Sequence, residues 1–377
     1  MRKFKILLAL NHAEIAGTEQ HVLKLARHIN KNLLDVSVVC FSEGPLIEIL
    51  KKQNIKVWAL KRKKKFDFLV ARKLFRLIKE NKFDLVHSHS GPFACIIGSI
   101  AKVPYAIETR HGLSFNFDDM EDLGLFNFLI NRLKAALVDL TLTVAKTDKT
   151  LLNTKFGVPL QKMRTVPNGV DIKELQHQIT NSQILKQNLK IDSNYNIVGT
   201  VARFTEQKGL TYLVRSIKHI KEKVPNTKFL IVGDGPLRDY LMDLAKELAV
   251  FQDIVFTGYQ DNAISFMSIF DIFVLPSLGE GMPYTILEAM ALKLPVVTTD
   301  VFGNRETVLN GKTGFLVPPR DSSALSAAII ELLMNRGTAL QMGKNGFYRV
   351  NEFFSARKTT EKIEQVYLEL LSSHAKN

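Results

Sequence analysis

The feature that most constrains the fold is an alternation of short apolar runs with amphipathic segments, which starts twice along the chain. Apolar runs of this length predict buried strands of a parallel sheet, and segments with apolar residues three and four apart predict helices on its faces. In the first half the predicted strands are 5–10, 36–41, 57–60, 84–89, 105–110, 140–145 and 163–168, with helices at 20–30, 45–53 and 68–80. In the second half the predicted strands are 196–204, 228–235, 253–259, 271–277 and 295–300, with helices at 211–224, 237–248 and 324–337.

Two such arrays predict two doubly wound parallel sheets, each in its own domain. At 377 residues the chain is also long for a single core. The break is expected between Pro167 and Asn196, where the sequence is polar and has no strong apolar period. We therefore expect one domain over residues 1–175 and a second over 176–354. The last segment, 355–377, is predicted to be a helix that packs back onto the first domain.

The composition is that of an ordinary globular protein, with 46% hydrophobic and 23% charged residues. Cys40 and Cys95 stand in apolar surroundings at no metal-ligand spacing, which fits a reduced, cytoplasmic protein. The apolar part of MRKFKILLAL is too short for a signal peptide and favours a first buried strand. No apolar run approaches the length of a membrane span.

The formal net charge of +14 is concentrated near the N-terminus. The stretch from Lys51 to Lys82 holds thirteen basic and two acidic residues, including KRKKK at 61–65. Within it, the helix over 68–80 should pack one apolar face on the core and expose its cations. Such a concentration of charge implies an anionic partner, which could be a membrane surface, an acidic acceptor or nucleic acid, and we rank the membrane first. It predicts a peripheral protein at the inner face of the cell membrane.

Several unusual residues follow predicted strands of the second half, where ligands of open parallel sheets bind. Arg203 and Lys208 flank the start of a helix and could clamp a diphosphate, or could be solvated loop cations. The GDG at 233–235 permits close approach of a ligand but is also an everyday tight turn. In SLGEGMPYTILEAMA, Glu280 lies in a glycine loop and Glu288 on the helix that follows. Pro283 is expected in the first turn of that helix.

The first half offers comparable strand ends. Gly17 is expected in a loop before a helix that begins near Glu19, where amide groups could meet an anion. His87, His89 and His111 each follow a strand; a lone histidine is usually a satisfied core or loop residue, and His111 is the best functional candidate. The acidic FDDMED at 117–122 is interpreted as a solvated loop. We expect no metal site, because no motif with metal-ligand spacing occurs.

These motifs together resemble retaining GT-B glycosyltransferases of the large family 4, also called "group 1" transferases. The donor-sugar domain of that family is matched by VARFTEQKG, LIVGDGP, EGMPYTILEAMA and GNRETVLNGKTGFLVPP. Its N-terminal domain is matched by AGTEQHV, FDLVHSHSG and MRTVPNGVD, so the resemblance covers nearly the whole chain. It implies two Rossmann-like domains facing across a cleft.

The resemblance also implies roles for individual residues. Glu280 would contact hydroxyls of the transferred sugar and Glu288 the ribose hydroxyls. Arg203 and Lys208 would neutralise the leaving diphosphate, with no metal or other cofactor. The amides of Gly281 and Met282, at the start of the helix, could assist at the phosphates. Gly17 matches the second glycine of the family's N-terminal loop, and the resemblance places His111 near the donor sugar and Tyr259 near the base. Ala16 departs from the family pattern, which has glycine at that position.

The expected activity is retaining transfer of a hexose or N-acetylhexosamine from a nucleotide-diphosphate sugar, with UDP favoured over GDP. The acceptor would be a membrane-associated glycan or lipid, such as a lipopolysaccharide or capsule precursor. A sugar-nucleotide epimerase or phosphorylase on the same fold is the first alternative. A basic nucleic-acid-binding protein is the second, although the basic stretch lacks the aromatic residues of single-strand binders.

Overall fold

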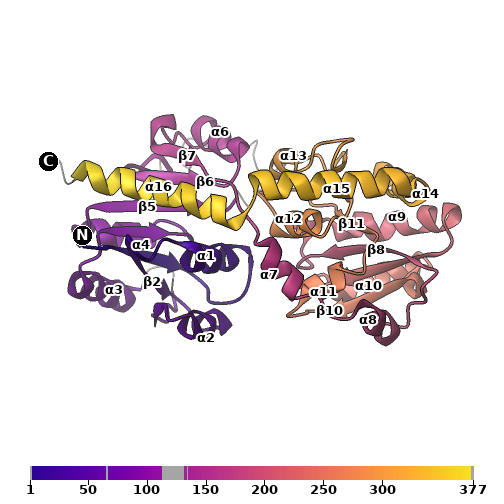
Figure 1. Ribbon diagram of the computed structural model, residues 1–377, viewed down its shortest axis with the longest axis horizontal. Coiled ribbons are helices and arrows are strands. Elements are labelled where there is room, and N and C mark those ends of the chain that lie inside the picture. The colour runs from indigo at the N-terminus through magenta and orange to yellow at the C-terminus, as the bar shows by residue number, and fades with distance from the viewer. Residues whose placement is uncertain (1, 65–66, 113–130, 134, 375–377) are drawn as a thin grey trace. The chain divides into compact units, whose positions relative to one another are not determined.

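The computed structural model describes the chain except for residues 1, 65–66, 113–130, 134 and 375–377. The described residues form two compact units, each built around its own parallel sheet (Figure 1). Unit 1 runs to Gly169 and resumes at Ala356, and unit 2 is Val170–Ser355. The acidic segment 117–122 lies outside the described residues.

Unit 1 contains a seven-stranded sheet in the order β3-β2-β1-β4-β5-β6-β7. Every pair of neighbouring strands is parallel, and β1 lies between β2 and β4. The strands are β1 (Phe4–Leu10), β2 (Leu34–Cys40), β3 (Lys56–Ala59), β4 (Leu85–Ser88), β5 (Tyr105–Arg110), β6 (Leu140–Thr143) and β7 (Met163–Thr165). The helices are α1 (Gly17–His28), α2 (Pro45–Lys52), α3 (Phe68–Asn81), α4 (Phe93–Ile100), α6 (Lys146–Thr154) and α16 (Ala356–His374).

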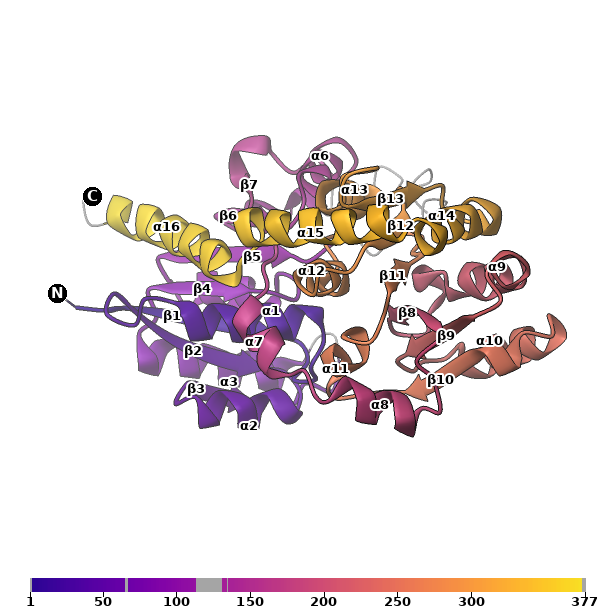
Figure 2. The ribbon, with the colours of Figure 1, turned by 45° about the vertical axis from the view of Figure 1, so that its right-hand side comes forward.

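The C-terminal helix α16 belongs to unit 1, although the whole of unit 2 precedes it in the chain. Ile363, Val366, Tyr367 and Leu371 are buried in the same core as the apolar residues of α1 and β1. In Figures 1 and 2, α16 is the yellow helix that lies along the strands of this unit, and it contacts α1. The expected return of the last helix onto the first sheet is therefore confirmed.

Unit 2 contains a six-stranded parallel sheet in the order β10-β9-β8-β11-β12-β13. The strands are β8 (Asn196–Val201), β9 (Thr227–Val232), β10 (Ile254–Gly258), β11 (Ile272–Leu275), β12 (Val296–Thr299) and β13 (Gly314–Val317). The helices are α7 (Ile172–His177), α8 (Ser182–Asn188), α9 (Leu210–Lys223), α10 (Arg238–Glu247), α11 (Ala263–Met267), α12 (Tyr284–Ala291), α13 (Phe302–Thr307), α14 (Ser322–Met334) and α15 (Arg336–Phe353).

All twelve predicted strands and all eight predicted helices, the one that carries Glu288 included, occur in the structure, so the expectation of two Rossmann-like parallel sheets is confirmed. The sequence analysis missed β13 at the sheet edge and the long helix α15. Pro283 caps α12 and precedes its first turn, whereas we expected it inside that turn. Gly17 is the first residue of α1 and not a loop residue.

The basic stretch forms the helix that the sequence predicts. Val70, Leu74, Leu77 and Ile78 of α3 are buried in the core under the sheet, while the arginines and lysines of the helix are exposed. Asp67 caps its N-terminus by accepting a hydrogen bond from the amide of Val70 at 3.1 Å. Among the residues described, no helix combines the length and the apolar character needed to cross a bilayer.

Candidate functional site

The candidate site of unit 2 lies where the strand order of its sheet reverses. The chain runs from β8 to β9 and β10 on one side, and returns to β11, β12 and β13 on the other side of β8. The loops after β8 and β11 therefore leave the carboxyl edge of the sheet side by side and diverge, which is where open parallel sheets bind ligands. Lys208 follows β8 and Glu280 follows β11, so this pair marks the reversal.

Lys208 and Glu280 form an ion pair, with the ammonium Nζ 2.6 Å from the carboxylate Oε1. The Ser277 hydroxyl donates a second hydrogen bond to the same oxygen, also at 2.6 Å. The side chains of Lys208 and Glu280 are only 23% and 7% exposed. Both contacts fall on Oε1, so the second oxygen of this held carboxylate is the one that can accept from a ligand hydroxyl.

Side-chain and backbone hydrogen bonds link the two loops to each other. The side-chain amide of Gln207 donates to the Gly279 carbonyl at 2.8 Å, and the amide of Leu278 donates to the Gln207 carbonyl at 2.7 Å. Gly209 has a φ of +62°, and a Cβ there would lie 2.0 Å from the Pro276 carbonyl oxygen. The site is thus held by main-chain geometry that tolerates only glycine at this point.

The first helix beyond β12 supports the same loop from the other side. A Cβ on Gly303 of α13 would lie 1.3 Å from the carbonyl oxygen of Gly281. The amide of Gly303 donates to the Glu280 carbonyl at 3.2 Å. Next in the chain, the buried Asn304 amide donates to Thr298 Oγ1 and to the Thr299 carbonyl, at 2.8 and 3.1 Å. The main chain at 280–281 is therefore packed against α13 with no room to shift.

Arg203 lies two residues beyond β8, and its side chain is exposed. The guanidinium makes no hydrogen bond or ion pair with any residue that the structure describes, so all its donors are available to a ligand. The amide of Phe204 donates to the Asp234 carbonyl at 2.9 Å. A Cβ on Gly235 would lie 2.7 Å from the backbone of Phe204, so the GDG turn packs directly on the loop that carries Arg203.

The other predicted donor-site residues lie along the same edge of unit 2. Gly281 and Met282 are buried just before α12, and Glu288 is buried on that helix, 7% exposed. The Tyr284 side chain is buried one turn earlier, where burial, together with the negative charge of Glu288, raises the pKa of its hydroxyl. Tyr259 follows β10, two strands from β8, and is 62% exposed.

Unit 1 repeats this topology, with β1 between β2 and β4, but the residues at the reversal are histidines. His89 follows β4 and His111 follows β5, and His89 Nδ1 lies 3.2 Å from His111 Nε2. His21 of α1 joins them, with ring centroids 4.7 Å from His111 and 5.3 Å from His89. The sequence analysis overlooked His21, because nothing local in a helix shows which strand ends it will face.

His87 is a structural residue. Its ring is fully buried, with Nδ1 2.6 Å from the Tyr367 hydroxyl of α16 and Nε2 2.6 Å from the Thr109 hydroxyl of β5. Both nitrogens are used within the core, which is the ordinary outcome for a buried histidine. Of the three histidines at predicted strand ends, His89 and His111 remain as site candidates.

Sequence reasoning also overlooked Ser277, Gln207 and Gly303 in unit 2. Ser277 closes an apolar strand and looks like a boundary residue, and Gln207 stands in a polar loop between two predicted elements. Gly303 begins a matched motif, but its contact partner lies 22 residues away at Gly281. None of these carries a local signal, since each acts through the packing of one strand-end loop on another.

Two Rossmann-like units, each built on its own parallel sheet, are the architecture of the GT-B fold. Solved structures support this fold over nearly the full length. A glycosyltransferase from Rickettsia africae ESF-5 matches with a TM-score of 0.84, 21% identity and coverage of 98% of this chain and 99% of that one. An Anabaena protein, Alr3699/HepE in complex with UDP, matches with a TM-score of 0.82, 20% identity and coverage of 97% and 100%.

The family follows from the sequence comparisons. The model "Glycosyl transferases group 1" matches residues 181–349, and the model "Glycosyltransferase Family 4" matches residues 15–174. The chain is also 25% identical over 367 residues to the UDP-Gal:alpha-D-GlcNAc-diphosphoundecaprenol alpha-1,3-galactosyltransferase of Escherichia coli, covering 95% of each protein. The protein belongs to the group 1, family 4 glycosyltransferases.

Proposed function

We propose that the protein transfers a hexose or N-acetylhexosamine from a UDP-sugar to a membrane-associated glycan or lipid, with retention of anomeric configuration and without a metal. The observation that carries the proposal is the Lys208–Glu280 pair at the strand-order reversal of unit 2. The E. coli relative supports the choice of UDP and of a lipid-linked acceptor, because its name gives UDP-Gal as donor and a diphosphoundecaprenol-linked sugar as acceptor.

An extended donor fits the order of residues along the edge of the unit 2 sheet. Tyr259 follows β10, the GDG turn follows β9, Arg203 and Lys208 follow β8, and Glu280 follows β11, and these four strands are neighbours in that order. We assign the base to the Tyr259 end and the diphosphate to the two cations. The transferred sugar is assigned to Glu280.

The roles of the charged residues follow from their contacts. Arg203, whose guanidinium has no partner among the residues that the structure describes, would grip the diphosphate as a fork. Lys208 would divide its ammonium between Glu280 and a phosphate oxygen as charge grows on the leaving group, and such preorganised charge is usually the largest catalytic contribution. Glu280 would accept from a sugar hydroxyl, Glu288 would hold the ribose, and the amides of Gly281 and Met282 would meet the phosphates.

In unit 1 we assign His111 to the donor sugar and the exposed Gly17, at the N-terminus of α1, to an anionic group. Retention would follow front-face attack, in which the leaving phosphate takes the acceptor proton. Proton NMR of the first product formed would show the anomeric configuration. An inverted product would overturn the retaining mechanism but not the donor site.

Donor binding is the direct test. Titration calorimetry with a panel of UDP- and GDP-sugars should show that the protein binds a UDP-sugar. Arg203→Ala and Glu280→Gln should each lower the affinity for that sugar nucleotide about tenfold or more. Arg215→Ala is the matched control, because Arg215 is exposed on α9 away from the strand ends. Equal affinity of Arg203→Ala and Arg215→Ala would contradict the assignment of the diphosphate. Conversion of the sugar nucleotide to an epimer without any acceptor would favour the epimerase alternative.

The surface around α3 supports a peripheral site at the inner face of the cell membrane. Phe68 and Leu69 at the start of this helix are 92% and 73% exposed, and the basic residues Arg72 and Lys73 follow them. Exposed apolar side chains beside cations suit the interface of an anionic bilayer. The wild-type protein should float with anionic liposomes at low salt, and a Phe68→Ser, Leu69→Ser double variant should float markedly less. Leu340→Ser, which changes an exposed leucine of unit 2, is the control; a wild-type chain that stays in solution would contradict the proposal.

A further inference from the structure

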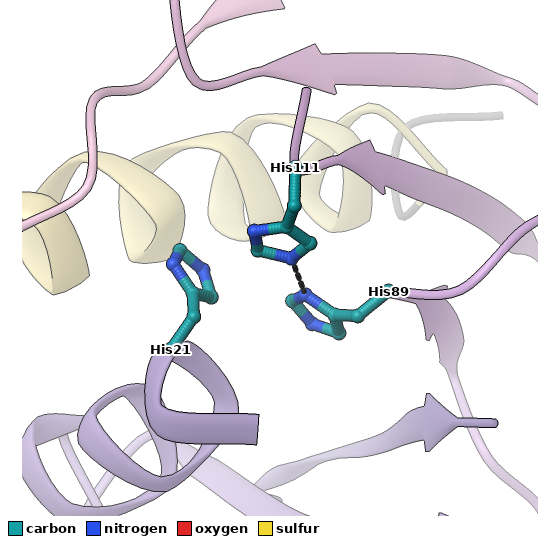
Figure 3. Close-up of side chains that lie close together, drawn as sticks. All are labelled: His21, His89 and His111. Carbon is teal, nitrogen blue, oxygen red and sulfur yellow. Dashed lines mark hydrogen bonds between the residues drawn. The ribbon is translucent and has the colours of Figure 1, made fainter. Parts of the chain in front are cut away.

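Three histidines of unit 1 form a cluster to which no role as a group has been assigned. One ring nitrogen from each of His21, His89 and His111 can be chosen so that all three lie within 4.8 Å of one another. Figure 3 shows the rings turned toward one another from α1, from the loop after β4 and from the end of β5. We propose that these three imidazoles bind a divalent transition-metal ion of the zinc class.

The distances suit such an ion after a small adjustment. Zinc–nitrogen bonds of about 2.0–2.1 Å in a tetrahedral site place the ligand nitrogens about 3.3 Å apart. The nearest nitrogens of His89 and His111 are already 3.2 Å apart. Only His21 needs to approach, and its ring centroid lies 4.7 Å from that of His111. Its ligand nitrogen must come closer to the other two, because the three lie within 4.8 Å of one another and a tetrahedral site needs about 3.3 Å.

The two remaining nitrogens of His89 and His111 face away from the proposed ion. His89 Nε2 and His111 Nδ1 are buried and have no hydrogen-bond partner among the residues that the structure describes. They therefore lack the outer hydrogen bond that usually supports a metal-ligating histidine, which lowers the expected affinity. The contact between His89 and His111 uses one proton on one ring. Metal binding there moves that proton to the far nitrogen of the same ring, so both rings stay neutral.

The Asn168 side chain orients the His21 ring. Its oxygen Oδ1 lies 3.1 Å from His21 Nδ1, so the ring donates from Nδ1 and presents Nε2 as the ligand nitrogen. A hydrogen bond to the far side of a histidine ring is the usual support of a metal ligand. The positive charge of Lys24 on the same helix opposes the ion. The affinity should therefore be lower than that of a site with a carboxylate.

The chemistry of the ligand set selects the ion. Burial lowers the pKa of all three imidazoles, so their lone pairs are not taken by protons near neutrality. Three imidazoles without a carboxylate favour zinc, cobalt, nickel or copper over magnesium or calcium. Three protein ligands leave a fourth position open to water or another small ligand.

The test uses the full chain without an affinity tag, stripped with a chelator and titrated with Co²⁺, whose absorption spectrum reports the coordination geometry. We expect one Co²⁺ per chain with the absorption of a four-coordinate site, displaced by Zn²⁺. His21→Ala and His89→Ala should each weaken binding more than about tenfold, and Asn168→Ala about 10–100-fold. His219→Ala, which removes an exposed histidine of α9, should bind as the wild type does.

Either of two outcomes overturns the proposal: a wild type that shows no four-coordinate Co²⁺ spectrum, or a His21→Ala variant that binds as tightly as the wild type. Asn168→Ala keeps the test valid if a histidine variant fails to fold, because it leaves all three ligands in place. No sugar nucleotide is present in these titrations, so their result is independent of the proposed transfer reaction. The ion is not needed for that reaction, and its occupation of His111 should inhibit transfer in the wild type.

Discussion

In both units the first strand of the array lies between the second and the fourth, β1 between β2 and β4 in unit 1 and β8 between β9 and β11 in unit 2. At this point unit 2 pairs Lys208 with Glu280, while unit 1 gathers the rings of His21, His89 and His111. A charged pair held by neighbouring loops suits an anionic, hydroxyl-rich ligand. Neutral imidazoles suit an uncharged ligand or a metal ion. One sheet topology therefore offers two different kinds of site, and the side chains at the strand ends decide which.

The largest effect is expected where unit 2 depends on main-chain packing. In Gly303→Ala the added Cβ would lie 1.3 Å from the Gly281 carbonyl oxygen if the main chain did not move. The main chain at Glu280 must shift, which should cost about 4 kcal/mol of stability in unit 2 and abolish UDP-sugar binding. Thermal unfolding and calorimetry measure the two effects.

The control for this prediction is Gly337→Ala in α15, where an added Cβ meets no atom within 4 Å. Replacing this open helical glycine by alanine should stabilise the protein by about 0.5–1 kcal/mol. If Gly303→Ala unfolds and binds donor as Gly337→Ala does, the loop of unit 2 is not fixed by α13. The sites of the two units would then differ only in the charge of their side chains, and not in how firmly the main chain holds them.

The second prediction concerns the neutral histidines of unit 1. Burial is the main cause that lowers the pKa of His21 from its ordinary 6.5 to about 4, and Lys24 adds to it. Below pH 6.5 His21 binds a proton in the unfolded chain but stays neutral in the folded chain. The free energy of unfolding therefore decreases as the pH falls from 6.5 to about 4. The loss from this one group is on the order of 3 kcal/mol.

Chemical denaturation in the presence of a chelator, across that pH window, measures the loss. His21→Asn should flatten the dependence on pH, because an amide does not titrate. The control is His219→Asn in unit 2, which replaces a half-exposed histidine. A wild type and a His21→Asn variant with the same slope would show that His21 is not held neutral by the fold.

The third prediction separates the two cations of unit 2. Lys208→Ala and Arg203→Ala should each lower kcat about a hundredfold, equivalent to about 2.7 kcal/mol of transition-state stabilisation. Only Lys208→Ala should also destabilise unit 2, because among the described residues it leaves the nearly buried Glu280 carboxylate with Ser277 as its remaining side-chain partner. Steady-state kinetics combined with thermal unfolding distinguishes them. Loss of stability in Arg203→Ala would mean that its guanidinium has a structural role.

The sequence was most informative where strands are buried on both faces. Such strands read as continuous apolar runs, as in β1 and β11, and every strand of this kind was found. The strand that was missed, β13, lies at the sheet edge and is only partly buried. It begins with Gly314, where a Cβ would lie 2.1 Å from the Val296 carbonyl oxygen. Its pairing depends on a close approach that no local pattern encodes.

Helix α15 shows the same limit for helices. Its sequence holds three glycines within eighteen residues, which weakens any local helix signal. Gly343 packs on the Lys293 carbonyl, where a Cβ would lie at 2.0 Å, and Gly346 packs on Met290. Glycines disfavour a helix locally, yet here they are the residues that let α15 pack closely on its neighbours.

The ion pair of Lys208 and Glu280 could not be predicted from local sequence either, because the two residues are 72 positions apart. Only the family resemblance suggested a common site before the structure placed them together.

The smallest effect is expected where a histidine of unit 1 is purely structural. Tyr367→Phe removes the hydroxyl that contacts His87 Nδ1 at 2.6 Å and leaves that buried nitrogen without its partner. The expected cost is about 1 kcal/mol of stability, measured by denaturation, with kcat unchanged. Tyr348→Phe, which alters an exposed tyrosine of unit 2, should change neither quantity. If Tyr367→Phe instead lowers kcat while stability is retained, His87 acts together with His89 and His111. The division of unit 1 into a structural histidine and a separate site cluster would then be wrong. The contact between the His87 and His89 rings, whose centroids are 4.0 Å apart, would contribute to activity as well as to packing.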